Sequence, residues 1–372
     1  MTLPLKDLRV IDLSTVLAGP NCARYLADFG AQVIKIEHPD GGDSLRNMAW
    51  RDPRDGEGMW WKLVNRNKRT IALDLKDAGD LAVLRELVAD ADVLVENFRP
   101  GTLERLGLGP DALHEINGRL IITRVTGFGQ TGPYASRPGF ATIAEVMSGL
   151  SAISGLPDGQ PLLPPIALTD EVTGVVAAFA TMVALHSGVG QVVDVSLLES
   201  LFQLMGPLIT RYRLTGEQQE RLGAGLPYSV PRGTYQCSDG KWVGLSASSD
   251  SVAARVLRVL GVEDDARFVT FAARMEHREE LESVMADWCR RHPQVEVLAT
   301  FSAAEAAIGP VMDMADISAD PHYAAREAIV EVEGTPMQGL LAKLSATPGA
   351  LRWQGRGLDA DGAAIREKGW TL

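Results

Sequence analysis

Short apolar runs alternate with helix-patterned segments along the first 130 residues. The apolar runs lie at 8–13, 31–37, 70–75, 92–98 and 119–129. A helical segment closed by Gly30 follows the first run, and 79–90 carries apolar residues at helical spacing. Strands that alternate with helices form right-handed parallel units, so the pattern predicts an α/β fold with a doubly wound, Rossmann-like sheet.

A long apolar helix is expected directly after Asp170, from 171 to 188. Glu171, Thr173 and His186 interrupt its apolar stretch, so we interpret it as a core helix of a soluble protein and expect no membrane span. The segment 140–150 predicts a shorter helix upstream. The segment 191–205 predicts a strand followed by another helix.

Composition changes at 211–231, where polar residues, glycine and proline predict a linker. Beyond it, 233–247 predicts a β-hairpin that turns at Asp239-Gly240, and helices are expected at 251–261 and 279–291. This part predicts a smaller α+β lobe that ends near residue 310. Apolar runs at 328–334 and 340–346 predict short strands near the C-terminus.

Overall charge and cysteine content narrow the class of protein. The 372 residues are 46% hydrophobic, 23% charged and carry a formal net charge of -12, which argues against a nucleic-acid partner. Cys22, Cys237 and Cys289 lack CxxC spacing, which is typical of a reducing compartment, and we expect a cytoplasmic protein. The six histidines form no HxxxH or HExxH pair, so no metal site is expected.

Standard nucleotide-binding and hydrolase motifs are missing from the sequence: no GxGxxG follows the first strand, and neither a P-loop nor GxSxG occurs. The basic run 65–69 is interpreted as a solvated turn rather than a nucleotide site. GFGQTG at 127–132 is a glycine-rich turn after a strand. Asp170 is either the N-cap of its helix or a nucleophilic carboxylate, and its own surroundings favour the cap.

Several long motifs occur in an order that resembles class III CoA-transferases. They are LRVIDLSTVLAGP, ADFGAQVIKIEHPDGGD, NRNKRTIALDLK, ADVLVENFRPGTLERLGLG, TGFGQTGPYASRPGF, the D-x-x-x-G helix from Asp170, and GQVVDVSLLES. This CaiB/BaiF family includes formyl-CoA transferase, carnitine CoA-transferase and α-methylacyl-CoA racemase. The resemblance implies a large Rossmann-like domain from 1–210 and 325–372, a small α+β domain at 225–315, and a homodimer of interlocked rings.

The same resemblance implies that Asp170 is the nucleophile and forms an aspartyl-CoA thioester. The substrates would be an acyl-CoA and a carboxylic acid acceptor, with no tightly bound cofactor. The helix N-terminus is expected to lower the pKa of Asp170, and the glycine-rich turns to donate N–H groups to the oxyanion. The implied CoA-contacting positions are Leu17, Ala18, His38, Leu73, Asp74, Leu75, Lys76, Asn97, Phe98, Arg99, Arg105, Arg137 and Phe140.

Departures from the family pattern rank the alternatives. The racemase branch has a His where this chain has Phe140 and a Glu near Ala247, so epimerisation is disfavoured. Leu17 replaces the Gln of formyl-CoA transferase, and the segment LPYSVPRGTY lacks that enzyme's run of glycines. Both differences favour larger or less polar acids, such as dicarboxylates, carnitine-like acids or aromatic acids. His38 replaces an arginine that is frequent at this position in the family. The C-terminal segment lacks the family's usual GEHT-type ending. A non-catalytic CoA-binding protein and, more weakly, a lyase-like role stay open.

Overall fold

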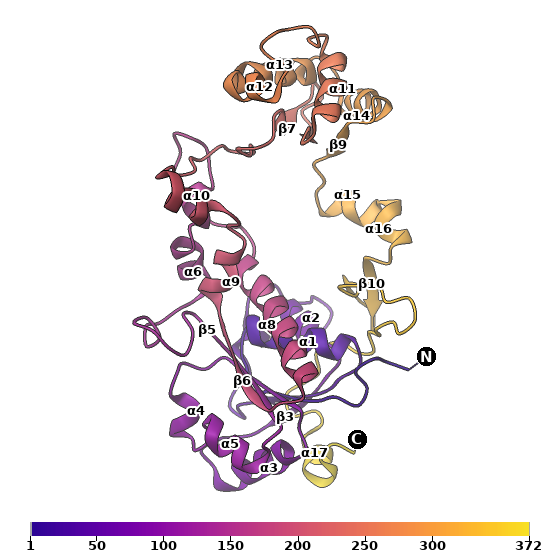
Figure 1. Ribbon diagram of the computed structural model, residues 1–372. Coiled ribbons are helices and arrows are strands. Elements are labelled where there is room, and N and C mark those ends of the chain that lie inside the picture. The colour runs from indigo at the N-terminus through magenta and orange to yellow at the C-terminus, as the bar shows by residue number, and fades with distance from the viewer. Residues whose placement is uncertain (1, 372) are drawn as a thin grey trace. The chain divides into compact units, whose positions relative to one another are not determined.

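The computed structural model describes residues 2–371, which form two compact units (Figure 1). The first comprises Met1–Leu150, Leu163–Gly206 and His322–Leu372. The second comprises Ser151–Leu162 and Pro207–Pro321. The predicted site residues all lie in the first unit, so the candidate site is built from that unit.

A six-stranded parallel sheet forms the centre of the first unit. Its strands are β1 (Arg9–Asp12), β2 (Gln32–Glu37), β3 (Lys68–Ala72), β4 (Val93–Glu96), β5 (Ile121–Thr126) and β6 (Gln191–Ser196). They lie in the order β3-β2-β1-β4-β5-β6, and every neighbouring pair is parallel. This is the doubly wound order, so the predicted fold class is confirmed.

Helices cover both faces of this sheet. They are α1 (Ala18–Asp28), α2 (Met59–Val64), α3 (Ala78–Ala89), α4 (Thr102–Arg105), α5 (Pro110–Ile116), α6 (Ala141–Met147), α8 (Leu168–Ser187) and α9 (Leu197–Gln203), with a 3-10 turn η1 at Ser44–Asn47. Because side chains alternate along a strand, Val10 packs with α1 and α8 while Ile11 packs with α3 and α5. Both residues are fully buried.

One face of α8 is not covered by its own unit. By length and composition α8 could cross a membrane, and it is the one such helix within residues 2–371, with a third of that stretch buried. The helix itself was predicted, but its burial is only partial. Val175, Phe179, Met182 and Val183 are exposed along it.

The basic run before β3 is buried, so its interpretation as a solvated turn is wrong. Arg66 makes a bidentate ion pair with Asp28, with Nη2 at 2.6 Å from Oδ2, and also donates to the backbone carbonyls of Gln338 and Gly339. Lys68 lies 2.9 Å from Asp12, and burial lowers its pKa to about 8. Removing one partner of such a buried pair lowers the free energy of unfolding by about 3–5 kcal/mol, so this run stabilises the first unit.

The C-terminal segment closes the first unit along the outer edge of β3. Asp361 and Asp359 accept the amide N–H groups of Thr70 and Ala72, at 3.0 and 2.8 Å. The helix α17 (Gly362–Lys368) and Trp370 then pack against the face that carries Ile11. The hairpin here is β10 (Ile329–Val332) and β11 (Thr335–Gln338), so the strand expected at 340–346 is wrong.

The second unit contains an antiparallel sheet of β7 (Arg232–Gln236), β8 (Trp242–Ser246) and β9 (Ala307–Pro310). Gly240 has a φ of 79° in the predicted hairpin turn. Tyr235, Val243 and Leu245 pack against the helices of this unit. The remaining helices of the chain are α7 (Leu150–Ile153), α10 (Leu208–Thr215), α11 (Asp250–Leu260), α12 (Phe271–Glu276), α13 (Arg278–Arg290), α14 (Gln294–Ala303), α15 (Met314–Ala319) and α16 (Pro321–Ala325).

Candidate active site

Asp170 is the third residue of α8 and lies within the first turn of the helix. The N-cap is Ala167, which makes no side-chain capping bond, so the interpretation of Asp170 as the cap is wrong. Within residues 2–371, no hydrogen bond or ion pair to the Asp170 carboxylate is found. Its neighbour Thr169 donates to the buried Glu145 of α6 at 2.9 Å. Among the described residues, the Asp170 carboxylate therefore makes no polar contact that stabilises the fold.

Gly174 explains the D-x-x-x-G pattern. A Cβ atom at this position would lie 2.6 Å from Asn21 Cβ and 3.2 Å from the carbonyl oxygen of Ala18. The start of α1 therefore packs directly on α8, one turn after Asp170, and the two helices lie side by side (Figure 1). Asn21 and Thr173 carry buried side-chain atoms without a hydrogen-bond partner in the described part of the chain, which is uncommon in folded proteins.

The pKa of Asp170 is raised to about 6, mainly because the carboxyl is buried, and further because Glu171 and Glu145 carry like charge. The expected lowering by the helix N-terminus is wrong, since desolvation outweighs the helix dipole here. At neutral pH the carboxylate still predominates, and it is more basic than an exposed Asp. A raised pKa with a clear physical cause is typical of catalytic carboxylates.

Glu171, the next residue, has a different environment. It accepts a hydrogen bond from Tyr25 at 3.2 Å and lies 3.4 Å from the buried guanidinium of Arg24. Both partners belong to α1. Glu171 thus links the two helices, while Asp170 keeps its carboxylate unpaired.

A cavity of about 240 Å³ opens at the carboxyl ends of β1, β2 and β3. Parallel α/β sheets bind their ligands at this edge, next to the point where the strand order reverses. Several predicted CoA-contacting residues line it together: His38, Leu73, Asp74, Leu75, Lys76 and Phe98. The His38 ring accepts the amide N–H of Asp40 at 3.0 Å through Nδ1.

The other predicted positions are not among the residues that line this cavity. Leu17 and Ala18 are buried at the start of α1, and Phe140 is 69% exposed before α6. Asn97 bonds to the backbone of Thr15, so its side chain is already engaged. Four of the predicted positions are exposed cations without an ion-pair partner within residues 2–371: Lys76, Arg99, Arg105 and Arg137.

Sequence reasoning missed several residues of the site. Thr15, Glu37, Gly42 and Asp43 line the cavity, and Glu145 influences Asp170. The polar run HPDGGD directly after the strand at 31–37 was a usable signal, because loops at this sheet edge bind ligands. No signal pointed to Glu145, since it lies within an ordinary helical pattern.

The backbone amides of the glycine-rich turn after β5 are less available as hydrogen-bond donors than expected. The amide N–H of Gly129 donates to the Thr126 hydroxyl at 3.0 Å, and that of Gln130 donates to Asp194 at 2.9 Å. These two amides are engaged, so they do not serve an oxyanion in this conformation. Within residues 2–371 no cluster of three or more His, Cys, Asp or Glu side chains could hold a metal ion.

Comparison with known proteins agrees with this geometry. The chain matches the family model of CoA-transferase family III over residues 5–361. It is 40% identical to the succinyl-CoA–D-citramalate CoA-transferase of Chloroflexus aurantiacus, over 95% of this chain and 91% of that protein. It is 35% identical to the succinate–glutarate CoA-transferase of Agrobacterium fabrum, over 94% of this chain and 91% of that protein. A CaiB/BaiF family protein from Brucella suis has a similar crystal structure, with a TM-score of 0.88 at 31% identity over 99% of this chain and 100% of that chain.

The match to the family model along nearly the whole chain, together with the doubly wound sheet, defines the class: the protein belongs to CoA-transferase family III. Relatives that share 35–40% of its residues over most of its length are CoA-transferases. The protein is accordingly an enzyme, a CoA-transferase whose substrates are CoA thioesters.

Proposed function

We propose that this enzyme moves CoA between two dicarboxylic acids through a covalent aspartyl-CoA thioester at Asp170. The observation that carries the mechanism is the Asp170 carboxylate, which is partly buried, has a raised pKa and is unpaired among the described residues. The choice of dicarboxylic acids rests on the relatives, whose names specify succinyl-CoA with citramalate and succinate with glutarate.

The proposed reaction begins when the Asp170 carboxylate attacks the carbonyl carbon of the donor thioester. The C–S bond breaks, which gives a mixed anhydride and the CoA thiolate. The thiolate then attacks the aspartyl carbonyl, so that the donor acid leaves and the aspartyl-CoA thioester forms. The acceptor carboxylate repeats both steps in reverse and leaves as the new acyl-CoA. Burial of Asp170 supports the first step, because a poorly solvated carboxylate is a stronger nucleophile.

A transfer assay with trapping tests this proposal. With succinyl-CoA and free dicarboxylic acids, we expect new acyl-CoA by mass spectrometry, and hydroxylamine should convert Asp170 alone to a hydroxamate. The rate is expected to fall as pH drops through about 6, because only the carboxylate attacks. Monocarboxylic acids of equal length serve as matched acceptors. Bound CoA without any modified Asp170 would indicate a binding protein, and transfer without modification would exclude the covalent route.

We also propose that two copies of the chain form a homodimer, and that the second copy covers the exposed face of α8. A hollow of about 460 Å³ beside this face is lined by apolar side chains, including Tyr25, Phe29, Val175, Phe179 and Leu341. A soluble protein rarely leaves such a surface open to water. We further propose a cytoplasmic location, which the three unpaired cysteines support.

Charge on the exposed face of α8 should weaken the dimer. Phe179 is 70% exposed in the single chain, and Phe179→Glu is expected to shift the mass measured by light scattering from two copies toward one. Val295, 74% exposed on α14, provides the control, because Val295→Glu should leave the mass unchanged. A wild-type protein that is monomeric, or that pellets with phospholipid vesicles, would contradict the proposed dimer.

A further inference from the structure

The turn between β1 and α1 contains a strained residue. Val16 has a φ of 66°, in the left-handed region that β-branched residues rarely adopt. Such a conformation is unfavourable and persists only where surrounding contacts enforce it. The residues that follow it, Leu17 and Ala18, begin α1.

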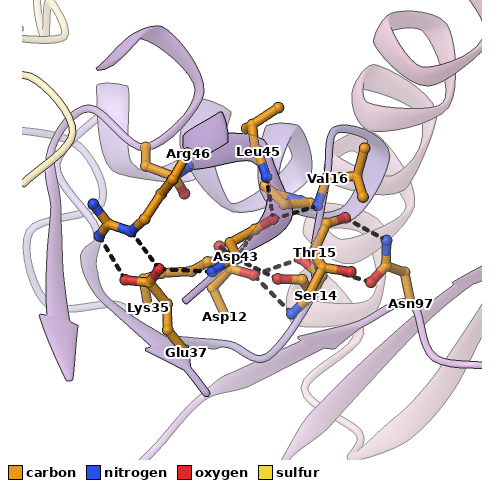
Figure 2. Close-up of polar contacts among 12 residues, drawn as sticks. Asp12, Ser14, Thr15, Val16, Lys35, Glu37, Asp43, Leu45, Arg46 and Asn97 are labelled. Atoms are coloured by element: carbon orange, nitrogen blue, oxygen red, sulfur yellow. Dashed lines mark hydrogen bonds and ion pairs between the residues drawn. The ribbon is translucent and has the colours of Figure 1, made fainter. Parts of the chain in front are cut away.

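Asn97, just after β4, fixes the residue before the strained one. Its Oδ1 accepts the amide N–H of Thr15 at 2.7 Å, and its Nδ2 donates to the carbonyl of Thr15 at 2.7 Å (Figure 2). Both polar groups of one peptide residue are thereby held by a single side chain. This contact crosses the point where the strand order reverses, between β1 and β4.

Asp43, which precedes η1, fixes the strained residue itself. Its Oδ1 accepts the amide N–H of Val16 at 3.1 Å and that of Leu45 at 3.0 Å. Its Oδ2 lies 3.1 Å from Lys35 Nζ, which also donates to the carbonyl of Ser14 (Figure 2). Asp43 is only 2% exposed, so these bonds form away from water, where charge-assisted hydrogen bonds are strong.

The turn connects the two halves of the candidate site. Thr15 and Asp43 line the cavity at the sheet edge. Two residues after Val16, the carbonyl of Ala18 lies against Gly174 on the helix of Asp170. A change in the backbone at Val16 would therefore move the start of α1 relative to the nucleophile, while the strands that floor the cavity stay in place.

We propose that Asp43 and Asn97 are positioning residues: they hold the Thr15–Val16 turn in its strained form and thereby keep the start of α1 aligned with Asp170. The proposal rests on the proposed function, because alignment matters for formation of the aspartyl-CoA thioester. Small displacements of reacting groups lower rates by about 100-fold, so the effect should fall on the chemical step and not on CoA binding.

Asp43→Asn tests the role of the carboxylate with little change in shape. Thioester formation in a single turnover is expected to slow by about 10- to 100-fold, while the Kd for CoA changes less than about threefold. Asp40→Asn is the matched control, since Asp40 is exposed in the same loop. A loss of CoA affinity as large as the loss of rate would assign Asp43 to ligand binding and overturn the proposal.

Val16→Gly separates a strain-holding role from a general structural one. Glycine adopts positive φ without cost, so Asp43→Asn should slow the Val16→Gly protein by no more than about threefold. Equal slowing in both backgrounds would overturn the proposal. Hydrogen exchange tests the positioning role independently of the proposed function. The amides of residues 15–17 should exchange at least about tenfold faster in the Asp43→Asn protein than in the wild type, whether or not the protein transfers CoA.

Discussion

Replacing Asp170 with Asn is expected to abolish CoA transfer while making the folded protein more stable at neutral pH. The amide cannot attack a thioester, so the rate should fall by at least about 10³-fold and no hydroxamate should form. The stability gain follows from the pKa of about 6, because the folded protein holds an unfavourable buried charge above that pH. Asn has the same shape without the charge.

The sign of the pH dependence is fixed by the direction of the shift. The pKa of an Asp in the unfolded chain lies near its ordinary value of 3.8. Between that pH and about 6 the folded state therefore binds more protons, and the wild type loses stability as pH rises. The full penalty, at most about 3 kcal/mol, is present above pH 6. The free energy of unfolding should be measured for the wild type and for Asp170→Asn at pH 5 and pH 8. The stability that the variant gains over the wild type should be roughly half as large at pH 5 as at pH 8.

Asp111 provides the control for this prediction, because it is an exposed aspartate in the first turn of α5. Asp111→Asn should keep full activity and should not gain stability at pH 8. If Asp170→Asn were less stable than the wild type at pH 8, the carboxylate would have a favourable partner in the folded protein. Retained transfer in that variant would remove Asp170 from the mechanism.

Gly174→Ala is expected to destabilise the protein by about 1–3 kcal/mol and to lower the transfer rate. Alanine normally stabilises a helix interior by about 1 kcal/mol relative to glycine. Here its Cβ would lie 2.6 Å from Asn21 Cβ and 3.2 Å from the backbone of Ala18, so α1 and α8 must separate. Chemical unfolding measures the first effect and the single-turnover rate the second.

Gly118→Ala is the matched control for that substitution. A Cβ at Gly118 would meet only the carbonyl oxygen of His114, at an ordinary 3.7 Å, so stability and activity should stay close to the wild type. Unchanged stability in Gly174→Ala would mean that the two helices can move apart without cost. The proposed alignment of α1 with Asp170 would then lose its structural basis.

The sheet could be predicted from sequence because its signals are local. Runs such as 8–13 and 31–37 are apolar throughout, as strands buried on both faces must be, and glycine marks the end of the helix between them. Pro20 lies in the first turn of α1, where proline is tolerated, so it does not interrupt the helix. Asp170 stood out through the order of long motifs, not through its own neighbours.

The electrostatics of the site could not be predicted, because they depend on residues distant in sequence. Glu145 raises the pKa of Asp170 from 25 positions upstream, and burial provides the larger effect. Arg66 looked like a surface cation because its partners, Asp28 and the carbonyls near residue 338, are far along the chain. Sequence spacing reports neither burial nor such contacts.

The C-terminal fastening of β3 has a consequence for synthesis on the ribosome. The outer edge strand is complete once residue 72 has been made, but the carboxylates that bind its amides are at 359 and 361. Nearly the whole chain must therefore emerge before that edge is closed. Until then the nascent sheet presents unpaired amides that could pair with another chain, so chaperone protection should be needed until translation is nearly finished.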